Sequence, residues 1–265
     1  MRYDGGVIAT KSSKGDSRAI ELLNQSITID DVCQINIYNP KRKFNVRYAL
    51  LEFMWYLSMD PKVRNIGKAA SIWKDIQDDE GKVESNYGLY VFGENWEWIV
   101  TELESDPESR RAVISIYDNS HKHSNYRDHP CTMSLQFLIR NERLHLIWNM
   151  RSSDLVFGFC NDMFCAGMIL QLMLNELDEM DLRLGDITFN LGSLHIYERH
   201  FKMIFKASKF WNDPSKVAGE TFILDKNITQ QSLRLNWCGI NSSHSLETMG
   251  KKVSEFESKC IKGFK

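Results

Sequence analysis

Residues 164–177 constrain the fold more than any other segment, because they are apolar on nearly every side. The apolar side chains include Met168, Ile169, Leu170, Leu172, Met173 and Leu174. A helix without a polar face has to be covered all round, so we expect this segment to be a buried central helix. With 265 residues, 43% of them hydrophobic, the chain can supply the core that such a helix needs.

Two short segments before this helix predict a pair of strands. Residues 132–139 and 144–150 are joined by Arg140-Asn-Glu-Arg143, a connection short enough for a tight turn. Further strands are expected at residues 19–23, 26–29, 111–117, 186–194, 221–224 and 232–237. Helices are expected at residues 46–57, 90–103 and 198–208. This mixture, without a repeat or a linker, predicts a single α+β domain over residues 1–265.

Several polar stretches lack a periodic pattern. Residues 5–16 are rich in Gly, Ser and Lys, and the C-terminal stretch is polar and rich in lysine. We therefore expect residues 1–16 and about 242–265 to be mobile. Residues 73–83 and 118–129 are expected to be irregular.

Composition argues against several classes of protein. A net charge of -2 without a long basic stripe disfavours binding to duplex DNA. The chain has neither a long apolar stretch nor an apolar signal region, so we expect a cytoplasmic protein. The six cysteines form no CxxC pairs, which favours reduced thiols over a structural zinc site. His121, His123 and His129 lack an acidic partner at matched spacing, so we expect no metal.

Cys131 is a candidate nucleophile. It follows Pro130 and comes directly before a predicted strand. A lone cysteine is more often a half-buried structural thiol. Arg151, at the end of the neighbouring predicted strand, is placed to lower the pKa of the thiol if the two strands pair.

Other residues allow both a structural and a functional interpretation. Arg110 and Arg111 are adjacent and taken alone are a solvated pair, although a guanidinium fork suits a phosphate. His195 and Tyr197 alternate on a predicted strand, so their side chains share one face. Glu52 lies in an apolar helix, where it either faces solvent or is buried with a raised pKa and a role in proton transfer.

The order of these motifs, over about residues 14–205, resembles the thymidylate synthase family. Glu52-Phe-Met-Trp-Tyr-Leu is similar to the family's Glu-Leu-Leu-Trp-Phe-Leu helix, and Pro130-Cys131 to its Pro-Cys. Ser85-Asn-Tyr-Gly88 resembles the segment with an active-site tyrosine. The resemblance implies that Cys131 is the nucleophile, that Glu52 is the general acid/base, and that Tyr87 also acts in catalysis.

The resemblance also implies a nucleotide site. Arg151-Ser-Ser-Asp154 is similar to the family's Arg-Ser-x-Asp, which assigns Arg151 and Ser152 to the phosphate. Gly158 matches a glycine beside the base. His195 and Tyr197 match the pair that holds the sugar 3'-hydroxyl.

Two further groups of residues follow from the same resemblance. Asp154 is implied on the pterin side of the folate, with Trp73 as a second folate contact. Ser109-Arg-Arg111 resembles the segment that donates two arginines to the phosphate in the partner subunit's site. The resemblance therefore implies a mixed β-sheet packed with helices and a homodimer formed through that sheet, with Arg110 and Arg111 acting in trans.

Departures from thymidylate synthases narrow the resemblance. Asp162 stands where they have an Asn that reads uracil, Thr132 follows the nucleophile instead of His, and Ser193 replaces the Asp of Gly-Asp-x-His-x-Tyr. Near the N-terminus, Lys14 is the one candidate for the role of their phosphate-loop Arg. These departures, with Phe157-Gly-Phe, are similar to the bacteriophage deoxycytidylate hydroxymethylases of the family.

This resemblance implies an enzyme that takes dCMP and 5,10-methylenetetrahydrofolate. A carboxylate at Asp162 suits the exocyclic amine of cytosine, since an unpaired buried polar group costs about 1–3 kcal/mol. Three alternatives remain on the same scaffold: a dCMP methylase, a deoxyuridylate hydroxymethylase and a CMP hydroxymethylase. A homologue without activity that binds nucleotide or RNA is the alternative from another class. If the source is a phage, the enzyme acts in the host cytoplasm.

Overall fold

A 7-stranded mixed β-sheet, in which β5 and β7 run parallel, organises the fold. The computed structural model describes residues 6–12, 15–37, 39, 41–42, 44–121, 127–209, 221–237 and 246–262. The main path has the order β1-β2-β7-β5-β4-β3, and β6 pairs with β7. These strands are β1 (Gly6–Ser12), β2 (Gly15–Ile29), β3 (Val113–Ser115), β4 (Thr132–Arg140), β5 (Arg143–Met150), β6 (Ser153–Asp154) and β7 (Arg183–Tyr197). A separate pair consists of β8 (Ile223–Leu224) and β9 (Ile261–Lys262).

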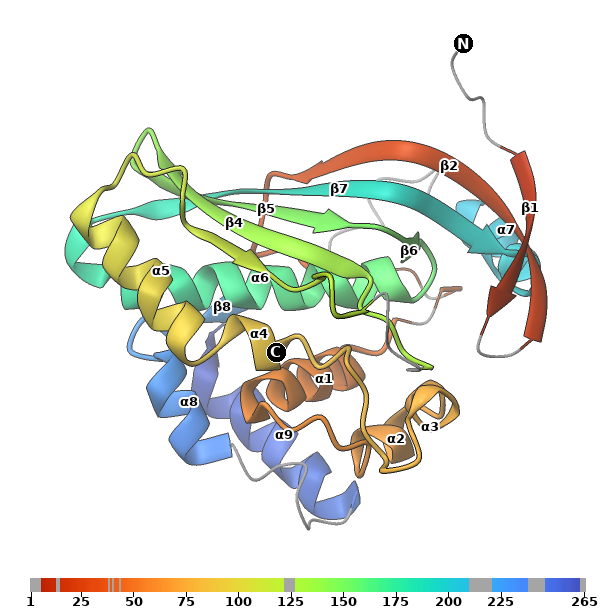
Figure 1. The fold of residues 1–265 in the computed structure, drawn as a ribbon. Helices are drawn as coiled ribbons and strands as arrows, with labels where there is room; N and C mark the ends of the chain where they lie inside the picture. Colours follow the sequence, from red (N-terminus) through yellow and green to blue (C-terminus); the bar gives the residue numbers. More distant parts are fainter. Residues whose placement is uncertain are drawn as a thin grey trace.

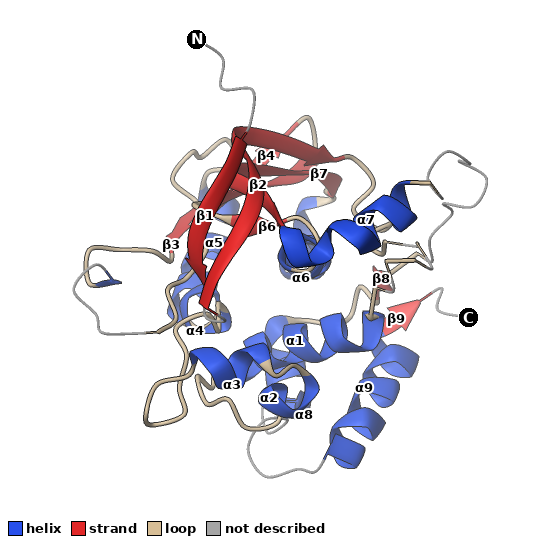
Figure 2. Ribbon diagram, turned by 90° about the vertical axis from the view of Figure 1, so that its right-hand side faces the viewer, coloured by secondary structure: helices blue, strands red, loops and turns tan. Residues whose placement is uncertain are grey.

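The helices of the described residues lie on one side of this sheet (Figure 1). They are α1 (Val46–Ser58), α2 (Ile66–Ala69), α3 (Ile72–Ile76), α4 (Gly88–Val91), α5 (Glu94–Ser105), α6 (Gly158–Glu176), α7 (Phe201–Ser208), α8 (Gln230–Trp237) and α9 (Leu246–Cys260). The long helix α6 runs along the sheet, α1 lies beyond it, and α8 and α9 are further out, as the turned view also shows (Figure 2). The expected α+β architecture is therefore confirmed.

The core forms where α6 meets the sheet. As predicted, α6 is covered nearly all round, and Phe164, Met168 and Leu172 are fully buried. The facing strand β5 alternates, with Leu146 and Trp148 buried on the inner face. This burial of apolar surface is the dominant favourable term in folding, and it fixes the position of α6 against the strand ends.

The opposite face of the sheet carries a polar ladder. Asn149 Nδ2 donates to Ser134 Oγ at 3.0 Å, and Asn190 Nδ2 donates to Asn149 Oδ1 at 3.0 Å. Ser26 Oγ donates to Asn190 Oδ1 at 3.1 Å, so the ladder spans β2, β7, β5 and β4. We call these four residues the polar ladder. None of the described helices covers this face (Figure 1).

Two expectations about the N-terminal half are wrong. Residues 6–12, expected to be mobile, form β1 and pair with β2 in register from Gly6↔Glu21 to Ser12↔Gly15. Their composition suggested a loop. The strand forms because it pairs with β2, and composition alone does not reveal such a pairing partner. Part of residues 73–83, expected to be irregular, belongs to α3, which buries Trp73.

Two expectations about the C-terminal part are also wrong. Residues 232–237 form part of α8 instead of a strand. The helix starts at reciprocal bonds between Thr229 and Ser232, from Ser232 N to Thr229 Oγ1 (3.2 Å) and from Thr229 N to Ser232 Oγ (3.0 Å). Residues 246–262, expected to be mobile, form α9 and β9. The Phe256 ring packs against Phe53 of α1, with 6.3 Å between the ring centroids.

Candidate active site

A cavity of about 430 Å³ lies where the ends of β5, β6 and β7 meet the first turns of α6 and the inner side of α1. Its volume is in the range of small-molecule sites. Most of the residues singled out from the sequence line it. They are Glu52, Trp73, Tyr87, Cys131, Arg151, Ser152, Asp154, Gly158, Asp162, His195 and Tyr197.

Strand β7 connects the core to this cavity. Its earlier residues pack under α6, and its last residues, His195 and Tyr197, line the cavity as their alternation predicted. Between these two parts of β7, Gly192 passes so close to the residue after β5 that an added Cβ would lie 2.9 Å from the carbonyl oxygen of Arg151. Strand β6 pairs with this end of β7 and sets Asp154 opposite His195.

Cys131 and Arg151 are neighbours, as the predicted strand pairing required. Arg151 Nε donates to the Pro130 carbonyl at 3.0 Å, and Arg151 Nη2 lies 3.9 Å from Cys131 Sγ. Arg151 favours the thiolate, but burial opposes it more strongly, and the pKa of Cys131 is raised to about 11. Arg151 therefore lowers this pKa as expected, but the net pKa is raised, because desolvation outweighs one guanidinium that also donates to backbone carbonyls.

Tyr87 and Thr132 fix the backbone beside the thiol. Thr132 N donates to Tyr87 Oη at 3.4 Å. Trp148 Nε1 donates to Thr132 Oγ1 at 2.8 Å, so the residue after the nucleophile is tied into the core through its hydroxyl. Behind this segment, Ser85 donates through its amide and its hydroxyl to Asp128, at 2.7 and 2.8 Å.

Two carboxyl groups in the cavity have raised pKa values. Glu52 is 5% exposed, so it is the buried alternative of the two considered from the sequence. Burial, and then the charge of Asp162, raise the pKa of Glu52 to about 8. Burial, and then the charge of Asp154, raise the pKa of Asp162 to about 7. Carboxyl groups that titrate near neutral pH can give and take protons during a reaction.

Asp162 points into the cavity without a hydrogen-bond donor of its own. No donor from the described residues contacts its carboxylate, and its pKa shift comes from burial and charge alone. One turn earlier on α6, Gly158 places no side chain against this carboxylate, where an added Cβ would be in van der Waals contact, 3.8 Å from Asp162 Oδ2. A planar ligand can therefore reach this carboxylate.

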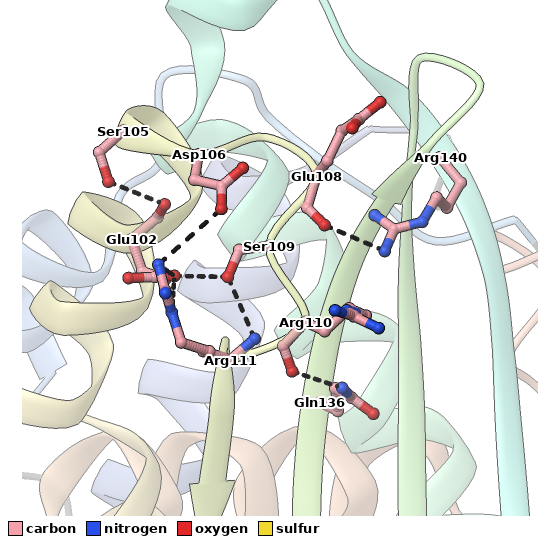
Figure 3. Close-up of polar contacts among 9 residues, drawn as sticks. All are labelled: Glu102, Ser105, Asp106, Glu108, Ser109, Arg110, Arg111, Gln136 and Arg140. Carbon is pink, nitrogen blue, oxygen red and sulfur yellow. Dashed lines mark hydrogen bonds and ion pairs between the residues drawn. The ribbon is translucent and has the colours of Figure 1, made fainter.

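Arg110 and Arg111 lie outside the cavity, between α5 and β3 (Figure 3). Arg111 Nη2 lies 2.8 Å from Glu102 Oε1, and Ser109 Oγ donates to the same oxygen. The Arg110 carbonyl accepts a bond of 2.9 Å from Gln136 Nε2, while its side chain projects outward (Figure 3). Lys14, the remaining candidate for phosphate binding, is outside the described residues.

Sequence reasoning missed several residues that line the cavity, among them Tyr48, Arg127 and Arg199. Tyr48 lies one helical turn before Glu52, a spacing that could have drawn attention to it. The guanidinium carbon of Arg199 lies 4.0 Å from the centre of the Tyr197 ring. Among the described residues, no group of three His, Cys, Asp or Glu side chains is placed to hold a metal ion.

Comparison with known proteins gives this site a family. The model of the family described as thymidylate synthase matches residues 13–218. The chain belongs to the thymidylate synthase family. The family transfers a one-carbon unit from methylenetetrahydrofolate to a pyrimidine nucleotide, and this chain is a one-carbon transferase enzyme.

Individual relatives of this thymidylate synthase family member fall into two groups. The chain is 31% identical over 224 residues to the deoxycytidylate 5-hydroxymethyltransferase of Enterobacteria phage T2, covering 79% of this chain and 85% of that protein. Identity to the phage T4 protein of the same name is 30%, with the same coverage. A thymidylate synthase from Bacillus mojavensis is 24% identical, covering 69% of this chain and 72% of that protein.

A solved structure confirms the fold. Thermostable thymidylate synthase A from Bacillus subtilis superposes with a TM-score of 0.63 at 18% identity, covering 76% of each chain. Within the described part of this family member, none of the helices combines the length and the apolar character that a bilayer crossing requires.

Proposed function

We propose that the enzyme is a deoxycytidylate 5-hydroxymethylase, which converts dCMP, 5,10-methylenetetrahydrofolate and water into 5-hydroxymethyl-dCMP and tetrahydrofolate. The observation that carries this proposal is the half-buried carboxylate of Asp162 in the cavity wall, which no donor of the described residues contacts. The exocyclic amine of cytosine supplies such a donor. Two relatives, from phages T2 and T4, carry the name deoxycytidylate 5-hydroxymethyltransferase.

Base selection follows from the chemistry of the Asp162 carboxylate. It accepts from the cytosine amine and shares a proton with ring nitrogen 3. Uracil would place an oxygen against the ionised carboxylate, which repels it and leaves a buried acceptor unpaired, at about 1–3 kcal/mol. We therefore expect roughly tenfold or greater preference for dCMP over dUMP.

The rest of the nucleotide is assigned to residues around the same cavity. His195 and Tyr197, at the end of β7, would hold the sugar 3'-hydroxyl. Arg151 and Ser152 would bind the phosphate, with Lys14 as a further cation. Arg151 keeps its contact with the thiol through one edge of the guanidinium, so phosphate binding and thiol positioning share one residue.

Covalent catalysis by Cys131 would activate the base. The thiolate adds to carbon 6, which makes carbon 5 nucleophilic enough to attack the one-carbon unit. Loss of the carbon 5 proton, together with cleavage of the bond to the folate nitrogen, releases tetrahydrofolate and leaves an exocyclic methylene. Water then adds to this methylene, and the carbon 6–sulfur bond breaks as the ring double bond returns. Glu52 and Tyr87 would carry protons and orient the water.

The cavity has features that fit a folate co-substrate. Folate supplies the one-carbon unit when it is bound. Asp154 and Trp73 line the cavity and would contact its pterin ring, and Glu52 Oε2 is buried without a hydrogen-bond partner in the described structure. A buried polar atom without a partner is rare, so a ligand or its water is expected to complete it.

We also propose a homodimer formed through the helix-free face of the sheet. That face presents the polar ladder together with exposed apolar side chains such as Val113 and Met133, which are 40% and 42% exposed. Arg110 and Arg111 lie beside this face and away from the cavity of their own chain. A partner subunit would bring them to the phosphate of the other site.

Mixed dimers test the action of these arginines in trans. Neither Cys131→Ala nor the double variant Arg110→Ala, Arg111→Ala should be active alone, whereas mixtures refolded together should regain part of the activity. Only a mixed dimer contains a site with both an intact thiol and two intact arginines. Steady-state assays after refolding from denaturant check this, and no recovery at any mixing ratio would rule out a contribution in trans.

The product decides between the proposed reaction and its alternatives. The enzyme is incubated with methylenetetrahydrofolate and equimolar dCMP, CMP and dUMP, and the nucleotides are weighed by mass spectrometry. We expect dCMP to gain one CH2O unit. A gain of CH2 would make the enzyme a dCMP methylase, and a product from CMP or dUMP alone would overturn the assigned substrate.

A further inference from the structure

Three side chains in the wall of the cavity form a hydrogen-bonded chain whose direction is fixed. Trp73 Nε1 donates to Tyr48 Oη at 2.8 Å. Tyr48 Oη donates in turn to Glu52 Oε1 at 3.2 Å. An indole nitrogen is a donor only, so the Tyr48 oxygen has to accept from Trp73 and its own proton is left for Glu52.

The two oxygens of Glu52 are therefore not equivalent. Oε1 receives the Tyr48 hydroxyl, whereas Oε2 is buried and has no hydrogen-bond partner in the described structure. The whole side chain lies in the cavity wall and is 5% exposed. Leaving a carboxyl oxygen buried and unpaired is unfavourable unless a ligand or its water completes it.

We propose that Tyr48, held by Trp73, is a positioning residue that occupies Glu52 Oε1 and so reserves Oε2 for proton transfer in the cavity. This inference rests on the proposed hydroxymethylase function and adds to it. In the hydration step, the water oxygen bonds to the exocyclic carbon and a water proton passes to Glu52 Oε2. The displaced electron pair enters the ring and then expels the Cys131 thiolate.

Among the groups around Glu52, the Tyr48 hydroxyl differs in its effect on the pKa of this carboxyl group. Asp162 and Cys165 face Glu52 from α6, and Tyr56 faces it from α1. Burial and the charge of Asp162 raise the pKa of Glu52, while the Tyr48 hydroxyl lowers it by stabilising the carboxylate. Loss of that hydroxyl should therefore raise the pKa of Glu52 from about 8 to a higher value.

The test compares Tyr48→Phe with Tyr90→Phe. Tyr90 offers a matched control, because its hydroxyl also donates to a carboxylate, Glu84, at 2.9 Å, but lies outside the cavity. Infrared titration measures the pKa of Glu52, with Glu52→Gln identifying its carboxyl band. We expect Tyr48→Phe to raise this pKa by about one unit and Tyr90→Phe to leave it unchanged.

Turnover gives a second measurement. In Tyr48→Phe, kcat should fall about tenfold with little change in KM for dCMP. The limb of the pH–kcat profile that reports Glu52, identified by its absence in Glu52→Gln, should move to higher pH. An unchanged pKa of Glu52 in Tyr48→Phe would overturn the proposal. If the wild-type enzyme forms no hydroxymethylated product, the proposed function fails, while the infrared titration still decides the role of Tyr48.

Discussion

Replacing Cys131 with Ala is expected to abolish turnover of dCMP, lowering kcat by a factor on the order of 10⁴ or more. Without the thiol, carbon 5 of cytosine stays too weak a nucleophile to attack the one-carbon unit. The thiol lies at the cavity wall, 3.9 Å from the Arg151 guanidinium, so its loss removes the reacting atom and little of the packing. Product formation under single-turnover conditions measures the effect.

Cys33→Ala is the matched control, because Cys33 is partly exposed and does not line the cavity. It should turn over dCMP like the wild type. The alkylation rate of Cys131 should rise with pH up to about 11, since burial keeps the thiol protonated in the free site. Retained activity in Cys131→Ala would remove covalent catalysis from the mechanism.

Replacing Asp162 with Asn is expected to reverse the base preference, with a loss of roughly tenfold or more on dCMP and a gain on dUMP. An amide presents both a donor and an acceptor, which suits the oxygen and the ring N–H of uracil. Because no donor of the described residues contacts Asp162, the change breaks no hydrogen bond there, although it removes the charge that helps to raise the pKa of Glu52. The ratio of kcat/KM values for dCMP and dUMP measures it.

The preference of the wild-type enzyme should also depend on pH. Burial raises the pKa of Asp162 to about 7, so its ionised form dominates above pH 7 and its neutral form below. The neutral acid has a donor that can face the uracil oxygen, and selectivity for dCMP should therefore fall as pH falls through 7. Asp178→Asn, an exposed change outside the cavity, should keep this profile. A wild-type base preference in Asp162→Asn would refute the assigned role.

Much of the fold followed from long periodic segments. The apolar pattern of residues 164–177 predicted α6, and the short Arg140–Arg143 connection predicted the β4–β5 pair. Failures came where a short pattern fits two structures. Residues 232–237 alternate like a strand, but the reciprocal Thr229–Ser232 bonds start a helix there. Six residues are too few to separate a period of 2 from one of 3.6.

For the candidate site, the sequence predicted the residues that line the cavity better than their pKa values. Family motifs placed Cys131, Arg151 and Asp162 around one cavity, but the balance between burial and charge at Cys131 was beyond sequence reasoning, because desolvation depends on the surrounding fold. The C-terminal helix was missed although Val253, Phe256 and Cys260 follow a helical spacing. Its polar, lysine-rich exterior hid this stripe.

The polar ladder allows the helix-free face to be exposed to water in a single subunit. Because its amides and hydroxyls satisfy one another within one chain, that face does not depend on a second copy to fold. Pairing through it would then be a bimolecular event that follows folding instead of accompanying it. The appearance of active enzyme after synthesis would scale with the square of the subunit concentration, so that activity in a cell sets in steeply once enough copies have accumulated.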